Sequence, residues 1–159
     1  MRFLLFITAF VSMIATAQAQ SCYSAAEVEA EQGLRIHSEL MVISLNCQHI
    51  NHQNGNLYFQ YKDFTRQHQP LIAEYEQTMK NYFRRTGKPN PEASINDLRT
   101  QLANKISTDA ANMKPNVFCG YYGGRIQQAL QMDRPKLRRW AATVFPSHPV
   151  SRPVCASLR

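Results

Sequence analysis

The sequence predicts an all-α fold: an up-and-down bundle of about four principal helices, a short fifth helix and an extended C-terminal tail, clamped by two disulfides. Three observations support this class. Apolar residues recur at spacings of three and four along several long stretches, which is the period of a buried helix face. Helix-start residues precede these stretches, and no alternating run is long enough to predict a strand. The four cysteines lie near predicted helix ends, where cross-links can tie helices together.

The first 19 residues have the three parts of a cleaved secretory signal peptide. A basic start at Arg2 precedes an apolar run, and Ala17 and Ala19 mark a cleavage site. The apolar run is shorter than the roughly 20 residues of a membrane-spanning helix, and no later segment predicts a transmembrane anchor. We therefore expect residues 20–159 to form a single helical domain, exported across the inner membrane of a bacterium into the periplasm.

The first helix is predicted from about Ala25 to Leu45. Ser24 and Glu27 form a capping-box pattern at its start, in which each side chain can accept from the backbone N–H of the other residue. Apolar residues occupy much of its circumference, which is typical of a central helix. A polar loop with an Asn-Gly turn signal follows.

A second helix, over residues 57–85, is predicted by the most regular apolar stripe in the chain. Pro70 interrupts this stripe, and a proline inside a helix removes one backbone hydrogen bond at a cost of roughly 3 kcal/mol. The stripe keeps its phase on both sides of Pro70. This favours one kinked helix, while a break into two helices stays open.

The following residues predict two more principal helices. Ser94, with Asp97 three positions later, opens a third helix that ends near Met113, before a proline. The fourth helix is expected from residues 116–118 to Met132. It returns the chain to the end of the bundle where the first helix begins.

A short fifth helix and an extended tail complete the chain. Asp133 is the predicted N-cap, Pro135 lies in the first turn, and the helix ends after Trp140. Residues 143–159 hold three prolines and are expected to be extended. Only a bonded Cys155 would hold this tail in place.

The predicted topology selects one pairing of the four cysteines among three connectivities. An exported chain with an even number of cysteines favours disulfides over a zinc or redox site. Cys22 and Cys47 flank a helix of roughly 30 Å, whereas bonded cysteines have Cα atoms within about 7 Å. In an up-and-down bundle Cys47 meets Cys119 at one end, and the tail returns Cys155 to Cys22 at the other. The expected disulfides are Cys47–Cys119 and Cys22–Cys155.

Three histidines and one glutamate are the candidates for catalysis or metal binding. His68 lies in the apolar stripe of the second helix, where it could be a tuned base or a satisfied core histidine. Glu39, in the middle of the first helix, is the best isolated carboxylate, against the alternative of a solvated glutamate. His49 and His52 could bind copper or zinc, or belong to a polar loop without metal. No other cofactor is expected, since the motifs of α/β-hydrolases, phosphate-binding loops and c-type haem are absent from the sequence.

The segment Cys-Gly-Tyr-Tyr-Gly-Gly-Arg at positions 119–125 has two interpretations. Its glycines are typical of a helix face that another backbone approaches closely. Alternatively, it forms a groove floored by glycine and walled by tyrosine, which could bind a peptide or a glycan. In that case the ligand-binding residues would be Asn116, Tyr121, Tyr122 and Arg125.

Basic residues gather at one end of the predicted bundle, and the formal net charge of the chain is +7 at pH 7. One interpretation is a solvated surface that complements helix ends. The other is a surface for an anionic envelope component or an acidic protein, while nucleic acid is not expected because no binding motif is present. The residues of this surface are Arg84, Arg85, Arg134, Lys136, Arg138 and Arg139.

Together these features predict an exported, disulfide-stabilised binding or structural protein of the cell envelope, without enzymatic activity. The basis is the lack of a catalytic motif and the rigidity that two disulfides give a small domain. The alternative is a small periplasmic metal-binding protein or hydrolase that uses the histidines and the glutamate above. The sequence indicates neither a specific partner nor an oligomeric state.

Overall fold

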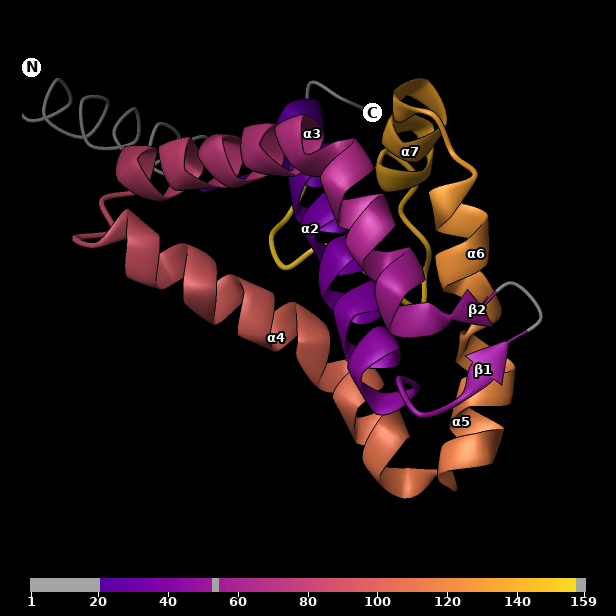
Figure 1. Ribbon diagram of the computed structural model, residues 1–159. Coiled ribbons are helices and arrows are strands. Elements are labelled where there is room, and N and C mark those ends of the chain that lie inside the picture. Colours follow the sequence, from indigo (N-terminus) through magenta and orange to yellow (C-terminus); the bar gives the residue numbers. More distant parts are fainter. Residues whose placement is uncertain (1–20, 53–54, 157–159) are drawn as a thin grey trace, which may run out of the picture.

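The computed structural model describes residues 21–52 and 55–156, and helices dominate it (Figure 1). The helices are α2 (Ala25–Asn46), α3 (Leu57–Arg85), α4 (Pro91–Asn112), α5 (Pro115–Tyr122), α6 (Gly124–Leu130) and α7 (Arg134–Ala141). Strands β1 (Asn51–His52) and β2 (Gly55–Asn56) form a small antiparallel hairpin between α2 and α3. The all-α prediction is confirmed. The predicted signal peptide lies outside the described residues, and within 21–52 and 55–156 no helix has the length and apolar character to cross a membrane.

Helix α2 lies in the centre of the molecule and packs against all the other described helices. Its N-terminus has the predicted capping box: Ser24 Oγ accepts from the Glu27 N–H at 3.3 Å, and Glu27 accepts from the Ser24 N–H at 2.7 Å. Leu34 is one of its fully buried side chains. Gly33 allows α3 to approach closely, because a Cβ at this position would lie 2.2 Å from Cε2 of Tyr75.

Helix α3 is a single helix with a bend. Pro70 lies in its interior, and Figure 1 shows the second half of α3 turning away from the direction of the first half. The proline has no N–H to complete the backbone ladder, which is a common cause of a kink. Phe64 and Leu71 are both buried, so the apolar stripe continues across the bend. The kinked interpretation is confirmed.

The start of α4 differs from the prediction. The helix begins at Pro91 rather than near Ser94, because Asn90 is the N-cap and its side chain accepts from the Ala93 N–H at 3.0 Å. A proline at the first helical position already has the required φ angle. The start of α7 agrees with the prediction, since Asp133 is its N-cap.

The predicted fourth helix is divided into α5 and α6. The division falls at the pair Gly123 and Gly124, where two adjacent glycines weaken helix propensity. Cβ atoms built at Gly120 and Gly124 would meet no atom within 4 Å. The close backbone approach expected for this segment is therefore not made at these two glycines.

Both predicted disulfides are present, at opposite ends of the bundle. The Cα atoms are 5.1 Å apart in Cys22–Cys155 and 5.6 Å apart in Cys47–Cys119. At the first of these, the Cys155 N–H also donates to the Tyr23 carbonyl at 2.9 Å. Two disulfides are typical of proteins that fold in an oxidising compartment.

Candidate ligand-binding site

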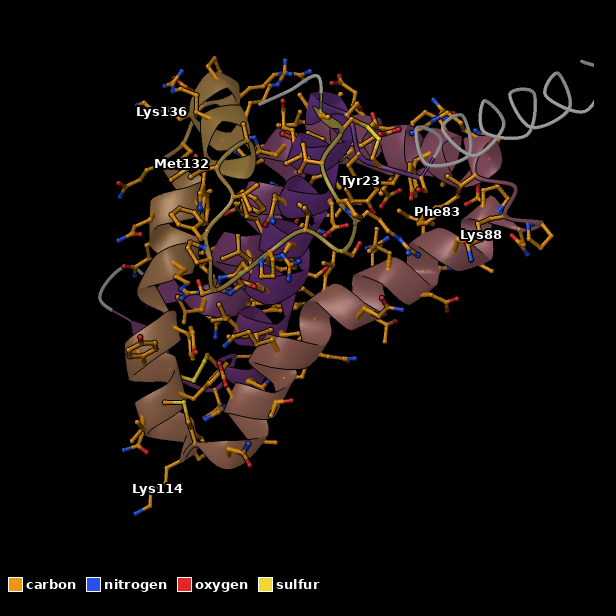
Figure 2. All side chains as sticks on the ribbon, turned by 180° about the vertical axis from the view of Figure 1, so that it is seen from behind. Tyr23, Phe83, Lys88, Lys114, Met132 and Lys136 are labelled. Carbon is orange, nitrogen blue, oxygen red and sulfur yellow. A yellow bond between two sulfur atoms is a disulfide. The ribbon has the colours of Figure 1, made fainter. Side chains whose placement is uncertain are left out.

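The C-terminal tail, residues 142–156, lies across α2 (Figure 2). Polar side chains of α2 hold it there. The side-chain amide of Gln32 donates to the carbonyl of His148 at 2.8 Å, and the guanidinium of Arg35 donates to the carbonyl of Pro149 at 3.0 Å. The tail is therefore fixed above one face of α2, where it can enclose space between itself and the helix.

A cavity of about 430 Å³ lies between the tail and α2, α6 and α7, and we call it the tail cavity. Small-molecule sites have volumes of about 300–1,000 Å³. Met132, labelled in Figure 2, lies at its α6–α7 end. The lining residues are Gln32, Arg35, Ile36, Glu39, Arg125, Gln128, Met132, Trp140, Thr143, Phe145, Ser147 and His148.

One part of the lining is apolar. Ile36 comes from α2, Met132 from the turn before α7, Trp140 from α7 and Phe145 from the tail. Phe145 is half exposed although it is a large apolar side chain. Aromatic side chains at the mouth of a concave site offer a large contact area to an apolar ligand.

Glu39 is the buried carboxylate of the cavity, with a side chain that is 11% exposed. One carboxylate oxygen lies 3.4 Å from Nη1 of Arg125, and the other lies 3.4 Å from Nε2 of His148. Burial raises the pKa of Glu39, and the charges of Arg125 and Arg35 partly oppose this effect. Buried carboxylates normally accept several shorter hydrogen bonds. Glu39 therefore has unused acceptor capacity in the cavity.

Arg125, on α6, is the second charged group. Its guanidinium lies over the Tyr122 ring at 4.8 Å from the centroid, and its side chain is 37% exposed. The Tyr122 hydroxyl donates to Asp109 at 2.6 Å, which fixes the ring that supports Arg125. Within the described part of the chain Arg125 donates only to Glu39, so other N–H groups of its fork are free for a ligand.

His148 lies between Glu39 and a hydroxyl. Its Nδ1 is 2.8 Å from Oγ of Ser147. Burial lowers the pKa of His148, and the charge of Arg35 lowers it further. His148 is therefore mainly neutral at pH 7, and it does not balance the charge of Glu39 at that pH.

The structure brings together two of the candidates predicted from the sequence and separates the others. Glu39 and Arg125 line the tail cavity. Tyr122 supports Arg125 from behind, whereas Tyr121 and Asn116 are exposed and do not line the cavity. A ligand-binding role for the exposed pair stays a prediction.

The histidine candidates lie away from the cavity. His68 is buried against Phe64, with ring centroids 4.9 Å apart, and burial lowers its pKa. His49 is exposed, and the side chain of His52 is outside the described part. Among residues 21–52 and 55–156 no three potential metal-ligating side chains gather at one point. Catalysis at His68 and metal binding at the loop stay predictions.

The predicted anionic-partner surface is partly neutralised. Arg85, Arg134 and Arg138 each form an ion pair with a glutamate, at 2.6, 2.6 and 2.7 Å. Figure 2 shows Lys136 at the outer end of α7. Binding of an anionic partner stays a prediction, which would depend on the exposed basic residues outside these pairs, Arg84, Lys136 and Arg139.

Of the lining residues only Glu39 and Arg125 were predicted as site residues from the sequence, and the missed residues include Arg35, Trp140 and His148. The spacing of Arg35 and Glu31 predicts that the two side chains pair on one helix face. It does not predict that the tail lies over this pair. Trp140 is the single tryptophan of the chain and follows a basic segment, which is a weak local signal. His148 has no local signal, because it reaches Glu39 only through the path of the tail.

The comparisons with known proteins add no information about this cavity. Comparisons of the chain with protein families, with curated proteins and with solved structures give no match. The chemistry of the lining residues is thus the basis for assigning a function.

Proposed function

We propose that the protein is an exported binding protein of the cell envelope, and that it holds a small amphipathic molecule in the tail cavity. The observation that supports this function is the combination of an apolar wall with two convergent charged groups, Glu39 and Arg125, in a cavity of about 430 Å³. Ligand sites typically combine a largely apolar lining with a few placed polar groups.

The bacterial periplasm is the compartment that we propose. Two disulfides fit an oxidising compartment, and the first 19 residues of the sequence have the pattern of a secretory signal. The Cys22–Cys155 disulfide also ties down the tail that forms one wall of the cavity. Oxidation would therefore complete the binding site.

Trp140 provides the test, because it is the only tryptophan and it lines the cavity. The oxidised protein is titrated with small molecules that share an apolar body and differ in charge: zwitterionic, anionic, cationic and neutral. We expect at least one class to change Trp140 emission saturably and to raise the Tm, since a ligand that binds the folded state stabilises it. If no class changes either quantity, the proposed function is wrong.

Two neighbouring tail residues provide a matched control. Phe145 lines the cavity and Val144 does not, although both side chains are about half exposed. Phe145→Ala should weaken binding, and Val144→Ala should leave it unchanged. Equal effects of the two substitutions would place the binding site elsewhere.

Ester or amide hydrolysis is a second candidate function, favoured by one arrangement. The His148 ring lies between the Ser147 hydroxyl and the Glu39 carboxylate, which is the arrangement of a nucleophile, a base and an orienting carboxylate. Binding has the better support, because the 3.4 Å contact between His148 and Glu39 is longer than an orienting hydrogen bond. A serine-directed fluorophosphonate should label Ser147 if this function exists, and His148→Gln should abolish the labelling. Absence of a labelled Ser147 peptide by mass spectrometry would rule it out.

A further inference from the structure

Two buried glutamates of α2 differ in the hydrogen bonds that their carboxylates accept from the protein. Glu31 is fully buried and accepts from the Ser151 N–H at 2.8 Å, from the Ser151 hydroxyl and, at 3.4 Å, from Arg35. Glu39 has two contacts, both at 3.4 Å, and one of them is with the neutral His148. Both oxygens of the Glu31 carboxylate therefore have donors within the protein. The Glu39 carboxylate has acceptor capacity left over in a cavity, which a donor on a ligand would use.

The charges around the cavity are balanced in adjacent pairs. Arg35 contacts Glu31, and Arg125 contacts Glu39. A purely anionic ligand at Arg125 would bring its charge close to the buried Glu39, and a purely cationic ligand at Glu39 would lie close to Arg125. Like charges repel, and more strongly beside a buried group such as Glu39 than in bulk water. A ligand that carries both signs avoids both conflicts.

The closeness of the two charged groups favours a short separation of charges on the ligand. A Glu39 oxygen and an Arg125 nitrogen are 3.4 Å apart, so a ligand whose two charges are close together can contact both groups at once. In an α-amino acid the ammonium and the carboxylate are attached to the same carbon. In a dipeptide they are further apart by one Cα-to-Cα step of about 3.8 Å. The apolar wall at Trp140 and Phe145 then receives the side chain.

We propose that the tail cavity binds a zwitterionic α-amino acid with a large apolar side chain. The ammonium group donates to Glu39, the carboxylate accepts from Arg125, and the side chain lies against Trp140 and Phe145. This inference rests on the proposed binding function and deepens it by naming the class of ligand.

The test compares L-leucine with close analogues, with Trp140 emission as the readout. N-acetyl-L-leucine lacks the ammonium, L-leucinamide lacks the carboxylate, and glycine lacks the apolar side chain. Each analogue should bind about 10- to 100-fold more weakly than L-leucine, because one charged hydrogen bond or the apolar contact is lost. L-phenylalanine should bind in the same range as L-leucine.

Variants assign each ligand group to a residue. Glu39→Gln should abolish the preference for L-leucine over N-acetyl-L-leucine, and Arg125→Gln should abolish the preference over L-leucinamide. Glu76 is the matched control, since it also forms an ion pair with an arginine, Arg99 at 2.9 Å, and does not line the cavity. Glu76→Gln should leave both preferences unchanged. Arg125 is partly exposed, so its variant tests the inference even if Glu39→Gln does not fold.

The outcomes separate this inference from the proposed function. If N-acetyl-L-leucine, L-leucinamide or glycine binds as tightly as L-leucine, the ligand class is wrong, while the cavity remains a binding site. If preferences for L-leucine exist but survive both substitutions, the assignment to Glu39 and Arg125 is wrong. If none of these compounds changes Trp140 emission or the Tm while another charge class of the wider panel does, the inference is wrong and the proposed function stands. If no class changes either quantity, both are wrong.

Discussion

The carboxylate of Glu31, fully buried on α2, accepts hydrogen bonds from both the backbone N–H and the hydroxyl of Ser151 in the tail. These residues are 120 positions apart in the chain. Arg35 contacts the same carboxylate and also donates to the carbonyl of Pro149. The tail is therefore fixed on the surface of α2 by a buried carboxylate, and the wall of the tail cavity depends on this anchor.

Loss of the Glu31 carboxylate should loosen the tail around Ser151, although Gln32 and the Cys22–Cys155 disulfide still hold it at other points. We expect Glu31→Ala to lower the free energy of unfolding by about 3 kcal/mol, because it leaves three partly buried donors of Ser151 and Arg35 without an acceptor. Amide hydrogen exchange at Ser151 should accelerate. Glu92→Ala is the control, since the Glu92 side chain is 66% exposed and its ion pair with Lys80 should contribute less than about 1 kcal/mol. Equal destabilisation by the two substitutions would contradict the anchoring role of Glu31.

The two disulfides should differ in what they hold. Each can contribute roughly 4–5 kcal/mol in a chain-entropy model. Replacing Cys47 and Cys119 by serine should destabilise the whole bundle, because both cysteines are fully buried. Replacing Cys22 and Cys155 should act partly through local fraying of the tail and should weaken ligand binding in the cavity. Denaturant unfolding and residue-resolved hydrogen exchange measure the two effects, and tail exchange that is unchanged in the second variant would contradict this account.

Two glycines should respond in opposite directions to alanine. Gly33→Ala would place a methyl group 2.2 Å from Cε2 of the buried Tyr75, so we expect a loss of at least about 2 kcal/mol of stability. Gly120 lies in α5 with open space around its Cα. Gly120→Ala should therefore stabilise by up to about 1 kcal/mol. Thermal unfolding measures the direction of the stability change in each variant. A Gly33→Ala variant as stable as the parent would mean that α2 and α3 pack less closely than described.

Acidification should destabilise the protein through His37. Burial lowers its pKa from 6.5 to about 4, and nearby Arg99 adds to this effect. The unfolded state then binds a proton more readily than the folded state, so stability is present above pH 6.5 and is lost as the pH falls toward 4. Between pH 7.5 and 5 the loss should be about 2 kcal/mol.

A substitution at His37 checks this pH dependence. His37→Gln removes the titrating group and keeps a polar partner for the Tyr61 hydroxyl, which lies 3.0 Å from Nε2 of His37. Urea unfolding at several pH values should show a smaller slope in this variant. The slope should not vanish, because burial also lowers the pKa values of His68 and His148. His49→Gln, on an exposed histidine, serves as control, and an equal reduction of the slope there would contradict the prediction.

Local signals in the sequence were enough to predict the positions of most helices, and the helix lengths then predicted the disulfides. The capping residues Ser24 and Asp133 mark true helix starts, since a cap is a contact within one turn. The disulfides followed from the helix lengths, because Cys22 and Cys47 are separated by a long helix. The Asn90-Pro91 start of α4 was missed although its signal is also local, because Ser94 and Asp97 resemble a second start.

The candidate site could be predicted only in part, because it depends on contacts between distant positions. Glu39 and Arg125 were identified as chemically suitable residues, but their separation of 86 positions gave no reason to pair them. Glu31 had the pattern of an acidic residue near a helix start, and its burial depends on Ser151. A proline-containing tail has no periodic pattern that gives its path, so the cavity that it encloses is not visible in the sequence.

The location of the bound ligand is the most direct test of the tail cavity as the binding site. In ¹⁵N-labelled oxidised protein, L-leucine should shift the indole N–H signal of Trp140, the side-chain N–H signal of Arg125 and the backbone N–H signals of residues 143–145, 147 and 148 more than any others. Lys136, on the outer face of α7, should not respond. Shifts that are confined to the exposed basic residues, or no shifts at all at saturating L-leucine, would contradict the account.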